Sequence, residues 1–129
     1  MKNKSLLKLL PISIFRDTIS EKLKQGNRKI QLNNFVGSSK SILASSIIKE
    51  SKSPQLFILN DKESANYFIN DLESLMNHEL FFYPATHRRS YQFKELDNSN
   101  VLLRAEVLNK LNNKHNSIIV SYPEAISER

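Results

Sequence analysis

The sequence predicts an α/β fold in which a parallel β-sheet is covered by helices on both faces, giving three layers. Two observations predict it. Short apolar runs typical of buried strands alternate with amphipathic stretches, and each helical stretch is long enough to be a parallel crossover. The chain has 129 residues, is 40% hydrophobic and contains no Cys, which is the composition of a globular domain. Thiolate catalysis, thiolate zinc sites and a disulfide framework are therefore excluded.

A basic segment over residues 1–28 precedes the body of the domain. Residues 1–29 contain eight basic and two acidic groups, whereas the rest of the chain carries eleven of each sign. Phe15, Ile19 and Leu23 recur every fourth residue, which predicts an amphipathic helix over residues 13–25. The basic charge fits either a solvated helix face or contact with phosphates or an acidic partner. No signal peptide and no membrane span is recognisable, so a soluble cytoplasmic protein without a membrane partner is predicted.

The first βαβ unit is predicted between residues 29 and 59. Lys29–Leu32 is expected to form a strand. Gly37 and the serines after it open a helix, which continues until Pro54 breaks it. Leu56–Leu59 is a continuous apolar run, typical of a strand that is buried on both faces.

A second helix and a further strand follow directly. Asn60 or Asp61 can cap a helix whose apolar residues, from Ala65 to Met76, follow the i, i+3, i+4, i+7 pattern. Leu80–Tyr83 is then predicted as a strand. This helix is the one that its periodicity indicates most clearly.

The last part of the chain is expected to add a polar connection, a helix and a strand. The connection covers residues 84–98, Ser99 can cap the helix, and Ile118–Val120 is predicted as a buried strand. Parallel sheets bind ligands at the carboxyl ends of their strands. Those ends are expected at residues 33–40, 60–62, 84–91 and 121–124.

The turn after the first predicted strand has the spacing of a phosphate-binding loop, G-x-x-x-x-G-K-[ST]. Lys40 and Ser41 occupy the last two places, and Gly37 lies within the turn. In intact loops, glycines let backbone N–H groups surround the phosphates, Lys contacts the terminal phosphates and the hydroxyl binds magnesium. Asn34 and Ser39 stand where the two defining glycines belong. Two interpretations therefore stay open. Gly37, Lys40 and Ser41 bind a nucleotide, or the turn is only the start of a helix and Lys40 is solvated.

The sequence contains no full catalytic set. Hydrolysis of a nucleotide would need a carboxylate at the end of another strand to hold magnesium. Asp61 follows a strand, but an Asp in that place is more simply a helix cap. The three His residues do not have metal-ligand spacing. No catalytic residue and no metal site are therefore predicted.

The polar connection contains the best candidates for contact with a partner. Paired Arg88 and Arg89 beside Tyr91 can bind phosphate or carboxylate groups and can also stack on a base. The alternative is that the two arginines form surface ion pairs within the domain. Their possible partners there are Glu95, Asp97 and Glu106.

Several segments, in their order along the chain, resemble a known family. They are the glycine-poor turn Asn-Phe-Val-Gly-Ser-Ser-Lys-Ser, then Phe-Ile-Leu-Asn-Asp-Lys-Glu, Leu-Phe-Phe-Tyr-Pro with Arg-Arg-Ser-Tyr, and Ile-Ile-Val-Ser-Tyr-Pro-Glu-Ala. The chain is similar to the N-terminal region of bacterial transcription-repair coupling factors, which is itself similar to the first domain of excinuclease B, the helicase-like component of the excision-repair nuclease. The resemblance runs from about Lys29 onward and is most specific at Asp97–Leu111 and Tyr122–Ala125.

The resemblance implies a partial P-loop NTPase or helicase-like domain over residues 29–129, with a second domain inserted after it. The parent would be an ATP-driven DNA translocase that displaces stalled RNA polymerase and recruits nucleotide-excision repair. The motor of such a protein uses ATP and magnesium. Its N-terminal module, by contrast, does not hydrolyse ATP and contacts excinuclease A, another component of the same nuclease, mainly through the inserted domain. The predicted function is therefore a non-catalytic scaffold and interaction domain without a cofactor of its own.

Two other functions stay open. The first is an active P-loop ATPase or helicase domain nearer to excinuclease B, which Lys40 and Ser41 favour. The second is an unrelated parallel α/β binding domain. The resemblance further implies that residues 84–98 are too short for the DNA-clamping hairpin of excinuclease B. An incomplete sheet should expose an unpaired edge or an apolar patch, which predicts self-association.

Overall fold

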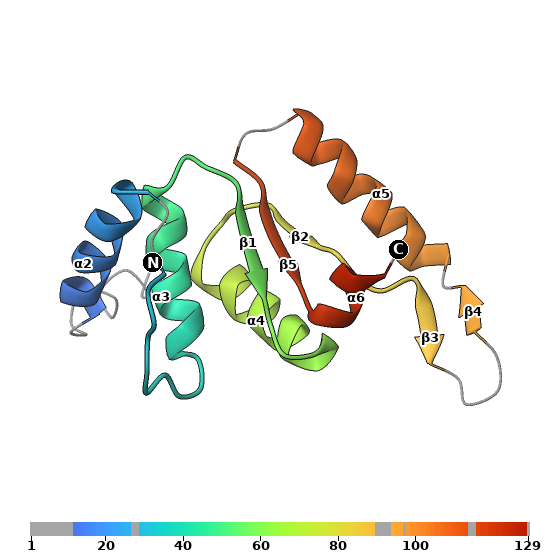
Figure 1. The fold of residues 1–129 in the computed structure, drawn as a ribbon, viewed down its shortest axis with the longest axis horizontal. Coiled ribbons are helices and arrows are strands. Elements are labelled where there is room, and N and C mark those ends of the chain that lie inside the picture. The colour runs from blue at the N-terminus through green and yellow to red at the C-terminus, as the bar shows by residue number, and fades with distance from the viewer. Residues whose placement is uncertain (1–11, 27–28, 90–93, 97, 114–115, 129) are drawn as a thin grey trace.

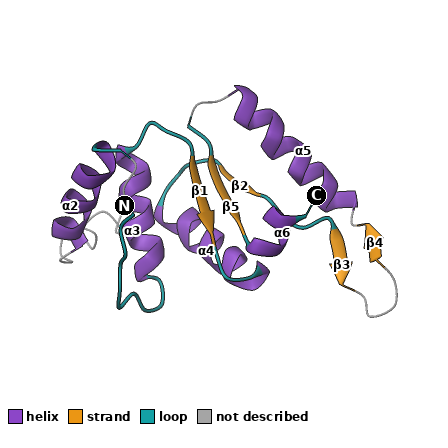
Figure 2. Cartoon of the chain, viewed as in Figure 1, coloured by secondary structure: helices purple, strands orange, loops and turns teal. Residues whose placement is uncertain are grey.

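The computed structural model describes residues 12–26, 29–89, 94–96, 98–113 and 116–128. Helices and strands alternate over most of this range (Figures 1 and 2). The elements are α2 (Ile12–Lys24), α3 (Ser39–Glu50), β1 (Gln55–Ile58), α4 (Lys62–Leu75), β2 (Leu80–Phe82), β3 (His87–Arg89), β4 (Lys94–Leu96), α5 (Asn98–Asn113), β5 (Ile118–Ser121) and α6 (Pro123–Ser127).

Three strands form a parallel sheet in the order β1-β5-β2, which confirms the α/β class. Ile118 of β5 pairs with Gln55 of β1 on one side and with Leu80 of β2 on the other. The last strand in sequence thus lies between the two earlier ones. β3 and β4 form a separate antiparallel hairpin.

The two crossover helices lie on opposite faces of the sheet. Ile118 and Val120 share a core cluster with Phe68 of α4, whereas the intervening Ile119 clusters with Val107 of α5. A right-handed crossover moves the chain in opposite directions on the two faces. The chain therefore steps from β1 past the central position to β2 through α4, and returns to the centre through α5.

The predicted helix from Ala65 to Met76 is confirmed as α4. Asp61 is its N-cap, and its carboxylate accepts a 2.7 Å hydrogen bond from the Ser64 backbone N–H. This bond to the charged form lowers the pKa of Asp61 below its usual value. Leu72 and Ala65 are fully buried on the face that packs against the sheet. The amphipathic helix expected over residues 13–25 is likewise present as α2.

The predicted strand Lys29–Leu32 is wrong, because residues 29–36 form no strand. Regular strand structure needs a hydrogen-bonded neighbour, and no strand lies beside this segment in the described part of the chain. The expectation that Leu56–Leu59 is buried on both faces is also wrong. Leu56 is 56% exposed and Ile58 is 55% exposed, because α5 packs over β2 and β5 and does not cover β1.

The expected polar connection is not a plain loop. β3 and β4 pair within it, with Arg88 opposite Glu95 in the register. A short hairpin therefore forms where only a loop was expected. The prediction that Ser99 caps the next helix is also wrong, because α5 begins at Asn98 and Ser99 is its second residue. No helix within the described ranges has the length and apolar character that crossing a membrane requires.

Candidate functional site

The turn before α3 is shaped by two residues in the left-handed backbone region. Asn34 has φ +66° and Gly37 has φ +56°. The left-handed region is costly for residues with a Cβ, so Gly37 fits its position. The Ser39 hydroxyl donates to the Val36 carbonyl oxygen at 2.7 Å and closes the turn. The side chain at the second glycine position of the phosphate-loop pattern is thus part of the turn itself.

Ser41 is held by a contact that the sequence pattern did not predict. Its side-chain oxygen donates a 2.9 Å hydrogen bond to Asp71 Oδ2 of α4, and the residue is only 3% exposed. In a working phosphate loop this hydroxyl binds magnesium beside the phosphates. Here the hydroxyl ties α3 to α4, and its proton points to a carboxylate.

Gly37, Lys40 and Ser41 do come together, at a pocket of about 370 Å³ beneath the turn. We call it the turn pocket. Its wall also includes Asp71 and the aromatic ring of Tyr67. Lys40 favours an anion there, whereas the Asp71 carboxylate repels one at short range. The described residues contain no group of three His, Cys, Asp or Glu side chains able to hold a metal ion.

Arg88 and Arg89 lie in β3, and Figure 1 shows β3 and α3 on opposite sides of the three-stranded sheet. In the hairpin register Arg88 is opposite Glu95, and Arg89 is opposite Lys94. The two arginines that the sequence indicates as partner contacts are therefore neighbours on one strand of the hairpin. Tyr91, the third predicted partner contact, lies outside the described residues.

A polar cluster at the carboxyl ends of β2 and β5 was missed by sequence reasoning. Arg104 Nη1 donates to the carbonyl oxygens of Pro84 at 3.0 Å and Ala125 at 2.9 Å, and lies 3.3 Å from Glu128 Oε2. The guanidinium also lies 4.2 Å from the centre of the Tyr83 ring. Arg104 and Glu128 are 15% and 16% exposed, so the pair is largely shielded from water. We call these residues the Arg104 cluster.

Further hydrogen bonds attach the chain after β2 to the Arg104 cluster. The backbone N–H of Ala85 donates to the Tyr122 hydroxyl at 2.9 Å, and its carbonyl accepts from Asn100 Nδ2 at 2.8 Å. The Thr86 backbone N–H donates to Glu128. These contacts fix the point at which the chain leaves the sheet toward the β3–β4 hairpin. No local sequence signal singles out Arg104 or Asn100, because polar residues occur along the whole of α5.

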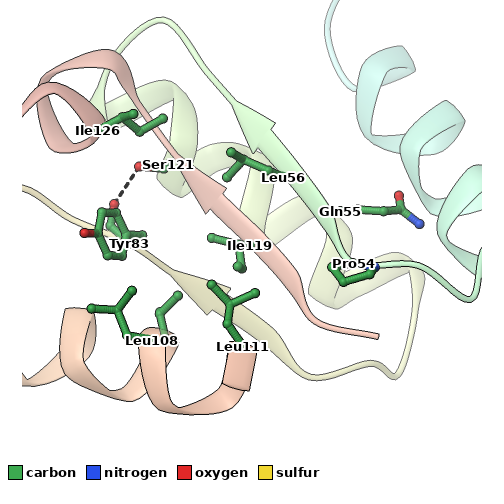
Figure 3. A pocket seen from close by; sticks show the side chains of 10 residues that line it. Pro54, Gln55, Leu56, Tyr83, Leu108, Leu111, Ile119, Ser121 and Ile126 are labelled. Atoms are coloured by element: carbon green, nitrogen blue, oxygen red, sulfur yellow. Dashed lines mark hydrogen bonds between the residues drawn. The ribbon is translucent and has the colours of Figure 1, made fainter. Parts of the chain in front are cut away.

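An apolar cleft opens on the face of the sheet that α5 covers only in part (Figure 3). Leu56 of β1 and Ile119 of β5 form its floor, and Leu108 and Leu111 of α5 form one wall. Its volume is about 350 Å³. The cleft contains few polar groups, so it offers a surface for packing rather than a site for chemistry.

Comparisons of the chain with protein-family models, with curated proteins and with solved structures each found no match. The candidate sites therefore rest on the geometry described above. Of the predicted residues, Gly37, Lys40 and Ser41 share one pocket, while Arg88 and Arg89 belong to a separate hairpin.

Proposed function

We propose that the chain is a non-catalytic scaffold and interaction domain of a transcription-repair coupling factor, with the partial three-layer fold of a P-loop NTPase. Such a protein works in the cytoplasm, on DNA and RNA polymerase, and recruits nucleotide-excision repair through excinuclease A. The observation that supports the non-catalytic role most strongly is the hydrogen bond from Ser41 to Asp71. The Ser41 hydroxyl, which would bind the magnesium of a nucleotide in a working phosphate loop, is occupied by this bond to Asp71.

One further observation agrees with the non-catalytic role, and a second agrees with the resemblance. No strand precedes the turn in the described residues, so its backbone is not anchored at the end of the sheet as a phosphate loop normally is. The segments of most specific resemblance also meet in space, because Arg104 of the first donates to the Ala125 carbonyl of the second.

The alternative is an active P-loop ATPase or helicase domain. Lys40 favours it, because its side chain lines the turn pocket beside Gly37. Against it stand the Asp71 carboxylate in the same pocket and the missing glycines at Asn34 and Ser39. Lys40 alone is a weak reason to expect nucleotide binding, because the glycines supply the phosphate-binding backbone N–H groups.

Binding of the purified chain to purified excinuclease A and to RNA polymerase tests the interaction role. We expect the chain to bind at least one of them by surface plasmon resonance. Replacing Arg88 and Arg89 by Glu should weaken that binding about tenfold or more, because it reverses the charge of β3 in the hairpin. The matched control is Lys49→Glu in α3 with Lys62→Glu in α4, which makes the same charge change at exposed positions outside the basic segment. Absence of binding to both proteins would contradict an interaction role for residues 29–129 and would leave partner contact to the inserted domain that the resemblance implies.

A further inference from the structure

The β3–β4 hairpin lies apart from the three-stranded sheet, beside the start of α5 (Figure 1). Among the described residues, its two strands pair mainly with each other. A two-stranded ribbon without packing against a core is only marginally stable by itself. The direction in which the hairpin points therefore depends on the residues that hold its two ends.

A carboxylate holds the end at which the chain enters the hairpin. Tyr83 still belongs to the sheet, because its backbone N–H donates to the Val120 carbonyl oxygen at 2.9 Å. Three residues later, the Thr86 backbone N–H donates to Glu128 Oε2 at 2.6 Å. Thr86 directly precedes β3, so this hydrogen bond lies at the base of the hairpin.

The other end of the hairpin is held by α5. β4 ends at Leu96 and α5 begins at Asn98, so the chain passes from the hairpin straight into the helix. Asn100, in the first turn of α5, donates to the Ala85 carbonyl oxygen at 2.8 Å. This contact joins the two ends of the hairpin to each other.

Glu128, the residue after α6, connects the base of the hairpin to that helix. The oxygen that accepts from Thr86 also lies 3.3 Å from Arg104 Nη1, and Arg104 donates to the Ala125 carbonyl oxygen of α6 at 2.9 Å. Both charged side chains are largely shielded from water, which strengthens their hydrogen bonds. Movement of α6 would therefore reach the hairpin through Glu128.

We infer that Glu128 is a positioning residue for the β3–β4 hairpin. Its carboxylate fixes the direction of the hairpin relative to the sheet and couples that direction to α6. A hairpin held in one direction loses less conformational freedom when a partner binds. The inference rests on the proposed function only in taking Arg88 and Arg89 as the partner contact. The direction itself is a property of the free chain and is measured without a partner.

Residual dipolar couplings of the backbone N–H groups, measured by NMR on the whole chain, test the inference. In Glu128→Ala we expect the couplings of residues 87–89 and 94–96 to fall toward zero, because the hairpin then samples several directions. The couplings of β1, β2 and β5 should stay as they are. Exchange of the Thr86 amide should become about tenfold faster or more, because a hydrogen bond to a charged acceptor is lost.

Two further variants separate positioning from a general loss of stability. Glu128→Gln keeps an oxygen that accepts from Thr86 and should retain the hairpin couplings of the unaltered chain. Ser127→Ala is the control in α6, where the Ser127 hydroxyl donates to the Glu124 carbonyl oxygen, and it should leave the hairpin unchanged. Unchanged hairpin couplings in Glu128→Ala would overturn the inference, as would an equal loss in the sheet. A Gln variant that behaves like the Ala variant would also overturn it.

Discussion

Arg104 holds three acceptors from two parts of the chain that are distant in sequence. One of its nitrogens donates to the carbonyls of Pro84 and Ala125 and to Glu128. Its guanidinium also lies over the Tyr83 ring. The planar head group supplies both the donors and the stacking face, a combination that Lys cannot offer. Arg104 thereby joins α5, the end of β2 and α6.

Replacing Arg104 by Ala should destabilise the fold by roughly 2–3 kcal/mol, because hydrogen bonds from a charged donor to half-buried acceptors are lost. Urea unfolding followed by circular dichroism measures the change. Arg104→Lys keeps the charge but lacks the planar guanidinium group. Its free energy of unfolding should lie between those of the unaltered chain and of Arg104→Ala. A loss below about 0.5 kcal/mol for Arg104→Ala, the usual effect of a surface substitution, would show that the cluster does not support the fold.

The Asp61 cap predicts a particular dependence of stability on pH. Its pKa in the folded protein is lowered, chiefly by the hydrogen bond from the Ser64 backbone N–H. The cap therefore contributes stability above the pKa of the unfolded chain and loses it as the pH falls through the lower folded value. We expect Asp61→Asn to have a lower Tm than the unaltered chain at neutral pH, and the difference to shrink in acid.

Thermal unfolding at a series of pH values checks this expectation. Glu63→Gln is the matched control, because it removes a carboxylate from the same turn without removing the cap bond. A Tm difference for Asp61→Asn that stays constant down to strongly acidic pH would contradict the assigned role of the charged cap.

Local sequence patterns predicted some of these residues and could not predict others. Gly37 in the turn and Asp61 as a cap act within a few residues of their own position, so the sequence indicates them. The contacts of Ser41 and Arg104 join residues at least twenty positions apart. Their partners depend on how whole elements pack, which no local pattern contains.

Among the helices and strands, too, those specified by their own local pattern were predicted correctly, and those that depend on a neighbouring element were not. α4 was predicted correctly because its own periodicity specifies which face is buried. The strand expected at Lys29–Leu32 has a suitable local pattern but finds no neighbour in the sheet. The run Leu56–Leu59 does form a strand, but the burial of its second face depends on a covering layer, and α5 does not supply one at β1.

α4 offers a test of the assignment of its two faces. Leu72 is fully buried, whereas Tyr67 on the same helix is 73% exposed. We expect Leu72→Ala to destabilise the protein by roughly 2–5 kcal/mol, through lost transfer free energy and a residual cavity. Tyr67→Ala should change the free energy of unfolding by less than about 0.5 kcal/mol. Denaturant unfolding of both variants measures these changes. Equal losses of unfolding free energy would contradict the assignment of the buried and exposed faces of α4.

The whole molecule exposes apolar surface on the side of the cleft. Leu56, Leu108, Leu111 and Ile126 are each between 40% and 56% exposed, and all four line the cleft. The sequence predicted such a surface from the expectation of an incomplete sheet. A contiguous apolar patch of this kind commonly mediates association between proteins.

We expect the chain to self-associate through the cleft. Light scattering should give a mean mass above the 14.9 kDa of one chain, rising with concentration. Leu56→Lys with Leu108→Lys should return the protein to a monomer, because charged groups in the cleft would lose hydration on association. Tyr67→Lys on α4 is the control and should leave the association unchanged. A strictly monomeric, highly soluble chain would contradict this expectation.

Calorimetric titration with Mg-ATP, run beside a Lys40→Ala variant, tests the central claim that the turn before α3 no longer serves a nucleotide. With Ser41 held by Asp71 and without the defining glycines, we predict no binding heat for either protein. Saturable binding by the unaltered chain that is lost in Lys40→Ala would contradict the scaffold account and would favour an active ATPase domain.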